Sequence, residues 1–142
     1  MNRAPAGKDT AMEDSDPSVE VTVTAQDDES AHIRIVGQLT EDARRPAIRL
    51  MTELMLHAPH LHRVEVDTSG VTFMNSAGMA VLVQLQKMGQ PRGIETVLIV
   101  QSAAVTRPLQ LSGLWHRFTI IDRRVDSPDV VHEATHRRSE HT

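Results

Sequence analysis

Residues 64–83 read VEVDTSGVTFMNSAGMAVLV, and they carry the strongest structural signal in the chain. The first four residues alternate apolar and acidic side chains, which is typical of a β-strand. The polar run at 67–70 predicts the end of this strand, and a short connection then leads to Asn75 and Ser76. Both residue types are favoured at helix N-caps. The stretch therefore predicts a strand, a short connection and a helix from about Ser76 to Met88.

The first half of this predicted helix is apolar all round. Residues 77–83 are apolar or glycine, whereas Gln84 and Lys87 make the second half amphipathic. A helix on one face of a sheet needs only one apolar stripe, so the other side of the first half is either covered or exposed as a patch. We therefore expect a partner-binding surface there.

The chain on either side alternates between strand-like and helix-like patterns. Strands are expected at 19–23, 31–36, 64–67, 95–100 and 118–121, and helices at 40–58, 76–88 and 102–111. The order β-β-α-β-α-β-α-β predicts an α/β fold with a mixed, mostly parallel sheet and helices packed against it. The first two strands are close enough in sequence to form an antiparallel hairpin.

The predicted domain spans 19–123 and lies between two polar segments. Residues 1–18 are expected to be a disordered acidic tail and residues 124–142 a flexible C-terminal tail, because both contain few aliphatic side chains. Pro108 falls inside the third predicted helix. Either that helix kinks there, or its regular part begins near Pro108.

Composition excludes several classes of function. The 142 residues contain no cysteine, which rules out disulfides, thiolate metal sites and cysteine nucleophiles. Three aromatic residues, a net charge of −4 and scattered arginines argue against a nucleic-acid partner. No apolar run has the length of a membrane span, and the N-terminus lacks the apolar core of a signal peptide. We expect a cytoplasmic protein that does not insert into the membrane.

Two histidine patterns suggest metal binding. His132, Glu133 and His136 match H-E-x-x-H, which holds zinc when it lies on a helix in a shaped cleft. Here the motif lies in a polar segment, so we expect a chance match rather than a metallohydrolase. The second pattern, at 57–62, reads as a solvated loop. Because glycine-rich phosphate loops and nucleophile–base pairs are also missing, we expect no catalytic residue, metal or cofactor and no enzymatic activity.

Residues 67–79, DTSGVTFMNSAGM, resemble a motif of the STAS domain of bacterial anti-sigma-factor antagonists, approximately D-L-S-x-V-x-F-[IM]-D-S-S-G-L. Further on, QSAAV at 101–105 and LQLSGL at 109–114 resemble that family's S-P-A-V and L-x-L-x-G-L segments. The similarity covers about residues 19–123. The resemblance implies a single STAS-type domain, whose order of elements is the order predicted above.

The resemblance also implies a partner and a site. In this family an anti-sigma factor that is also a serine kinase of the histidine-kinase-like ATPase type phosphorylates the serine after the aspartate of D-S-x-G. Ser76 takes that serine position, but Asn75 replaces the aspartate, and the family's G-E-[LI]-D reads GQLT at 37–40. The expected partner-binding residues are Gly37, Gln38, Leu39, Thr40, Asn75, Ser76, Ala77, Gly78, Met79, Ala80 and Val83.

Two functions remain open on the sequence. The first is an anti-sigma-factor antagonist that regulates sigma-factor-dependent transcription, with a switch by phosphorylation at Ser76. The alternative is a STAS adaptor subunit of a transporter or signalling complex, without phosphorylation, because three acidic positions of the family pattern are neutral here.

Overall fold

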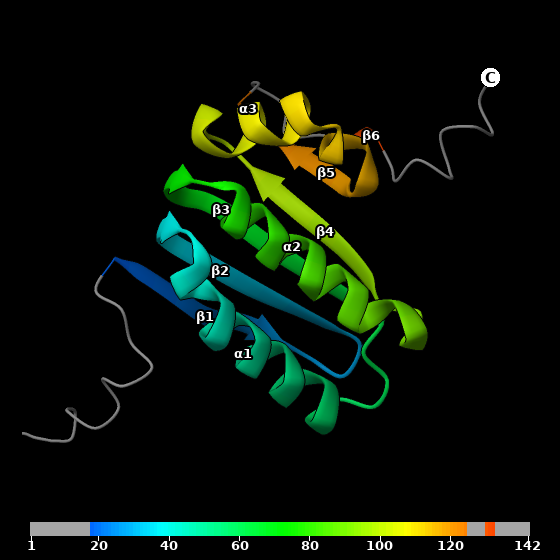
Figure 1. The fold of residues 1–142 in the computed structure, drawn as a ribbon. Helices are drawn as coiled ribbons and strands as arrows, with labels where there is room; N and C mark the ends of the chain where they lie inside the picture. The colour runs from blue at the N-terminus through cyan, green and yellow to red at the C-terminus, as the bar shows by residue number, and fades with distance from the viewer. Residues whose placement is uncertain (1–17, 125–129, 133–142) are drawn as a thin grey trace, which may run out of the picture.

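Six strands form one mixed sheet in the computed structural model, which describes residues 18–124 and 130–132 (Figure 1). The strands are β1 (Val19–Gln26), β2 (Ser30–Leu39), β3 (Arg63–Met74), β4 (Glu95–Val100), β5 (Thr119–Asp122) and β6 (Val130–His132). They lie side by side in chain order. β1 pairs antiparallel with β2, the next three pairs are parallel, and β6 returns antiparallel to β5. The predicted hairpin and mostly parallel sheet are confirmed.

Three α-helices connect the parallel strands. They are α1 (Arg44–His57), α2 (Ser76–Gly89) and α3 (Ala103–Ser112), and short 3₁₀ turns lie at Glu41–Ala43, Gln90–Arg92 and Leu114–Arg117. α1 and α2 run beside each other over one face of the sheet, and α3 lies near the end of β4 (Figure 1). The predicted α/β order of elements is confirmed.

The core between the helices and the sheet is aliphatic. Alternate residues of β2, such as Ile33 and Ile35, are fully buried, as are Met51 of α1 and Leu82 of α2. β4 is buried at five consecutive positions, from Thr96 to Val100. This is the pattern expected of a strand covered on both faces.

The predicted end of the third strand at 67–70 is wrong. β3 continues to Met74. Its pairing with β4 ends at Asp67, but its pairing with β2 continues to Met74 and keeps the chain extended. Two polar side chains of this run have partners in the sheet: the Thr68 hydroxyl donates to the carbonyl of Ile99 in β4 at 2.8 Å, and an Asp67 carboxylate oxygen accepts from the amide of Ser69 at 2.9 Å. The strand thus reaches Asn75 without the connection that the sequence suggested.

The position of α3 excludes one of the two alternatives for Pro108, a helix whose regular part begins near the proline. The helix begins at Ala103, after an extended N-cap residue at Ser102, so its regular part does not begin near the proline. Pro108 lies inside the helix and has no N–H to offer the carbonyl one turn earlier. Gly113 ends the helix with a left-handed φ of 84°.

The described structure continues beyond Arg123. Arg124 forms an ion pair with Asp122, and its guanidinium lies 5.9 Å from the centre of the Trp115 ring. β6 then covers the edge of β5, which would otherwise offer unpaired backbone groups. A strand of three residues is too short for periodicity to reveal it, so the sequence suggested only a tail. Of the H-E-x-x-H motif, His132 lies in β6, whereas Glu133 and His136 are outside the described residues, as are residues 1–17.

Candidate partner-binding site

The ends of β2 and β3 bring together two segments that are far apart in sequence. Leu39 pairs with Met74 at the end of the parallel ladder, and the amide of Asn75 donates to the carbonyl of Leu39 at 3.3 Å. The loop that follows β2 and the start of α2 therefore share one end of the molecule (Figure 1). The end of β2 and Thr40 therefore lie beside the start of α2, at Asn75–Gly78. The predicted end of the second strand at 36 is wrong, because Gly37, Gln38 and Leu39 continue the ladder with β3 and are strand residues.

Asn75 begins α2 as its N-cap, which confirms the predicted cap. Its backbone is extended, and its side-chain oxygen accepts from the amide of Gly78 at 2.9 Å. Ser76 is the first residue of the helix and is exposed. Its hydroxyl is therefore accessible beside the positive end of the helix dipole, where an added negative charge is tolerated.

Gly78 fits α2 tightly against the loop. A Cβ atom built at this position would lie 1.9 Å from the carbonyl oxygen of Leu39 and 2.6 Å from its carbonyl carbon. Both atoms belong to the backbone of a fully buried residue, so they have little freedom to yield. Glycine at this position lets the first turn of α2 approach the loop closely and fixes the distance between the two segments.

The apolar first half of α2 is mostly covered. Val81 and Leu82 are buried, and Met79 and Val83 are half-buried against the core. The exposed side consists of Ser76, Ala80 and Gln84, which are spaced by one helical turn. The surface is therefore small and smooth rather than a broad apolar patch, and Ala80 is a better outward-facing position than Val83.

Residues 37–40, at the end of β2 and just after it, divide into those that offer surface and those that hold the backbone. Gln38 is exposed and Thr40 is half-buried, with a hydroxyl that accepts from the amide of Asp42 at 3.2 Å. Leu39 is fully buried, and Gly37 has a left-handed φ of 105° where a Cβ would meet the Ser18 carbonyl. Gly37 and Leu39, like Gly78, therefore shape the site without presenting a side chain to a partner.

The sequence analysis missed three residues around this site. A Glu41 carboxylate oxygen lies 3.5 Å from the side-chain nitrogen of Asn75. Phe73 and Leu111 are large apolar side chains that are 49% and 80% exposed, and Ser112, next to Leu111, contacts the sulfur of Met79 at 3.7 Å. Glu41 meets Asn75 only in the folded chain, and the exposure of Phe73 and Leu111 depends on strand and helix positions that periodicity did not fix.

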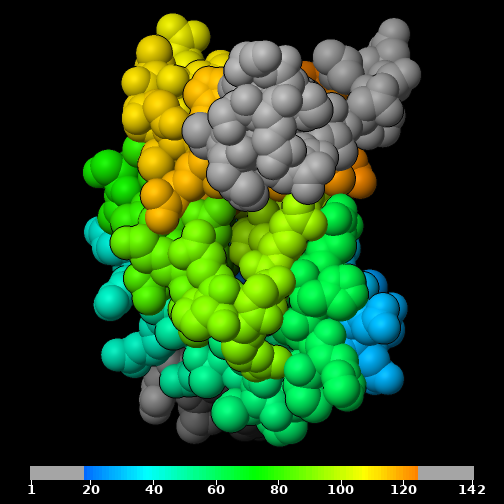
Figure 2. All heavy atoms as spheres, turned by 90° about the vertical axis from the view of Figure 1, so that its right-hand side faces the viewer, coloured from blue at the N-terminus to red at the C-terminus, as the bar shows by residue number. Residues whose placement is uncertain are grey.

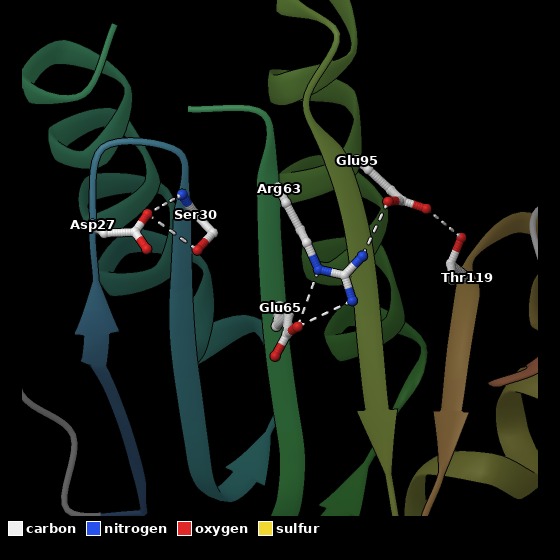
Figure 3. Close-up of polar contacts among 6 residues, drawn as sticks. All are labelled: Asp27, Ser30, Arg63, Glu65, Glu95 and Thr119. Atoms are coloured by element: carbon white, nitrogen blue, oxygen red, sulfur yellow. Dashed lines mark hydrogen bonds and ion pairs between the residues drawn. The ribbon is translucent and has the colours of Figure 1, made fainter. Parts of the chain in front are cut away.

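A further group of polar contacts lies at the opposite end of the sheet. The Arg63 guanidinium donates to the carboxylate of Glu65 at 3.1 Å and to the carboxylate of Glu95 at 3.3 Å (Figure 3). The Glu95 carboxylate also accepts from the hydroxyl of Thr119 at 3.0 Å. This chain of contacts ties β3 to β4 and β5. In the β1–β2 turn, the carboxylate of Asp27 accepts from the amides of Glu29 and Ser30, and these bonds lower its pKa.

The histidine-rich loop lies at that same far end. Figure 2 shows this end, where the end of α2 and the start of β4 lie beside the loop that precedes β3. His57 faces Glu53 at 3.6 Å and His62 faces Glu29 at 3.5 Å, so each imidazole has one carboxylate neighbour. Within residues 18–124 and 130–132, no group of three or more histidine, aspartate or glutamate side chains could hold a metal ion.

A family model described as "Mlab, STAS domain" matches residues 22–122, which is nearly the whole described fold. The chain belongs to the STAS domain family. Among curated proteins, none matches it significantly. No helix of this STAS domain, within the described residues, is long and apolar enough to cross a membrane.

Two solved structures share the STAS fold of this chain. An anti-sigma factor antagonist from Mycobacterium paratuberculosis is 22% identical, with a TM-score of 0.58, and the match covers 72% of this chain and 85% of that one. The anti-sigma factor antagonist SpoIIAA in its unphosphorylated form is 21% identical, with a TM-score of 0.60, and the match covers 72% and 87% of the two chains. At these identities the likeness establishes the fold.

Proposed function

We propose that this STAS domain is a cytoplasmic anti-sigma-factor antagonist. It binds a kinase-type anti-sigma factor through residues 37–41, at the end of β2, and the exposed side of α2, and thereby releases a sigma factor for transcription. The observation that carries the proposal is the exposed hydroxyl of Ser76 at the start of α2, beside a loop held by the Leu39–Asn75 contact. The names of the two similar structures agree with this role.

The geometry suits recognition by a rigid surface. Ser76 and Ala80 carry small side chains, so a partner can approach the helix closely. The loop is already fixed against α2 by backbone contacts, and a preformed surface loses little conformational entropy on binding. The domain needs no catalytic group of its own for this function, because a kinase-type partner supplies both the nucleotide and the base.

Phosphorylation at Ser76 would act through charge. Transfer of the γ-phosphoryl group from ATP to the Ser76 oxygen leaves ADP and adds about −1.5 to −2 charges at pH 7. The helix dipole stabilises this charge, so the domain stays folded. The partner is released because the added charge and volume disturb its complementarity to the surface on which Ser76 and Ala80 lie.

The experiment measures binding of the purified domain to anti-sigma factors of the histidine-kinase-like ATPase type from the same organism, by isothermal titration calorimetry. We expect stoichiometric binding that Ala80→Asp weakens at least tenfold. Gln90→Asp is the matched control, because it adds the same charge at an exposed position after the far end of the same helix. Failure of every such anti-sigma factor to bind would overturn the proposal.

Incubation with ATP separates the two functions left open by the sequence. Phosphate mapped to Ser76 by mass spectrometry, with loss of binding, supports the switched antagonist. Binding to the anti-sigma factor without phosphate at Ser76 supports an antagonist without that switch. Binding to a transporter or signalling subunit instead would favour the adaptor.

A further inference from the structure

Glu41 and Asn75 connect the two halves of the proposed partner-binding site. Glu41 opens the 3₁₀ turn that follows β2, and Asn75 is the N-cap of α2. The Glu41 carboxylate lies 3.5 Å from the Asn75 side-chain nitrogen, although the residues are 34 positions apart. The starts of α1 and α2 lie at the same end of the sheet (Figure 1).

The capping bond fixes which side of the Asn75 amide faces Glu41. The side-chain oxygen is occupied by the amide of Gly78 at 2.9 Å, so the NH₂ group points to the carboxylate. An amide side chain offers one acceptor and two donors, and this position uses both kinds of group. Aspartate would cap α2 equally well, but it would place a second carboxylate against Glu41.

We infer that Glu41 and Asn75 are a matched pair that positions residues 37–42 relative to Ser76, and that the Glu41 carboxylate makes an amide better suited to position 75 than a carboxylate. The inference rests on the proposed function in so far as the positioned surface is the one that binds the partner. Glu41 is thus a positioning residue, because it acts through Asn75 and the loop.

Backbone contacts support this pairing independently. The amide of Asn75 donates to the Leu39 carbonyl, and Gly78 leaves no space between α2 and that same carbonyl. Residue 41 is therefore held near the start of α2, and a repulsive pair at 41 and 75 would relax by rotation of the exposed Glu41 side chain toward solvent, with loss of its contact with Asn75. At position 75, where the family resemblance leads one to expect aspartate, asparagine supplies the side-chain N–H that faces the Glu41 carboxylate.

A double-mutant cycle on the free domain tests the pairing. We expect Asn75→Asp to lower Tm in the natural background, and to leave Tm unchanged or raise it when Glu41→Gln is also present. For two like charges about 4 Å apart at an exposed site, the change in Tm caused by Asn75→Asp should differ by roughly 3–6 °C between the two backgrounds. Because salt screens exposed charges, this difference shrinks at about 1 M salt.

The control cycle combines Asn75→Asp with Glu53→Gln, which removes an exposed acid near the far end of α1. Its effects should add, because residues without shared contacts are energetically independent. If Asn75→Asp changes Tm equally with and without Glu41→Gln, the inference is overturned.

The partner arm tests positioning rather than stability. At a temperature where all variants are folded, we expect Asn75→Asp to weaken binding to the anti-sigma factor about fivefold, and Glu41→Gln in the same chain to restore it. Coupling in Tm without any change in affinity would overturn the positioning role. If the natural domain binds no anti-sigma factor, the proposed function fails, whereas the Tm cycle still tests the pair.

Discussion

Gly78→Ala tests the close approach between α2 and the loop. The new Cβ would lie 1.9 Å from the Leu39 oxygen. Since an ordinary carbon–oxygen contact is about 3.3 Å, the helix and the loop have to separate by roughly 1.4 Å. Such overpacking costs about 1–3 kcal/mol, and loss of the Asn75–Leu39 hydrogen bond adds about 1 kcal/mol. Alanine returns about 1 kcal/mol through helix propensity, which leaves a net loss of about 1–3 kcal/mol.

Urea unfolding followed by circular dichroism measures this loss, and calorimetry should show Tm lower by roughly 5–15 °C. Two substitutions in the same helix set the scale. Gln84 is exposed, so Gln84→Ala should be neutral or slightly stabilising. Gly89→Ala should cost less than Gly78→Ala, because a Cβ at Gly89 would meet side-chain atoms rather than backbone, those of Ile94 from 2.9 Å and of Met51 at 3.4 Å. Stability of Gly78→Ala equal to that of Gln84→Ala would refute the tight contact on which the site geometry depends.

Three further predictions follow from specific contacts. The pKa of Asp122 is lowered chiefly by its side-chain hydrogen bonds to Arg124. The ionised carboxylate therefore stabilises the fold at pH values above its usual pKa, and this contribution is lost as the pH falls through the lowered pKa. In urea titrations, Asp122→Asn should reduce the loss of unfolding free energy below about pH 4. Arg92 donates to the carbonyls of Met55 and Ala58 at the end of α1, so Arg92→Ala should cost about 1 kcal/mol in thermal unfolding, whereas Arg107→Ala on the exposed side of α3 should cost nothing measurable. Ser76→Asp should weaken binding to the anti-sigma factor, while Ser76→Ala should bind and acquire no phosphate at position 76; equal affinity for both variants would contradict a charge-driven switch.

Much of the fold is encoded in local patterns. Strand-like and helix-like patterns predicted the order of strands and helices, and Asn75 was recognisable as an N-cap from residue type alone. The end of β3 was misjudged because its polar side chains are satisfied by contacts across the sheet, such as Thr68 to Ile99. A tertiary contact of that kind leaves no trace in periodicity.

The candidate site was predictable in outline but not in composition. The motif placed Ser76 and the loop together, and the structure agrees. It did not show that Leu39 and Gly78 are buried, because burial depends on how closely two segments approach. Nor could it pair Glu41 with Asn75, since the two residues meet only when β2 and β3 end side by side.

Displacement of the sigma factor tests the proposed antagonism. A preformed complex of anti-sigma factor and sigma factor is titrated with the purified domain, and free sigma factor is measured by size-exclusion chromatography. The account predicts that about one equivalent of the natural domain, but not of Ala80→Asp, releases the sigma factor, and that the Gln90→Asp control releases it fully. A sigma factor that stays bound in excess natural domain would contradict the account.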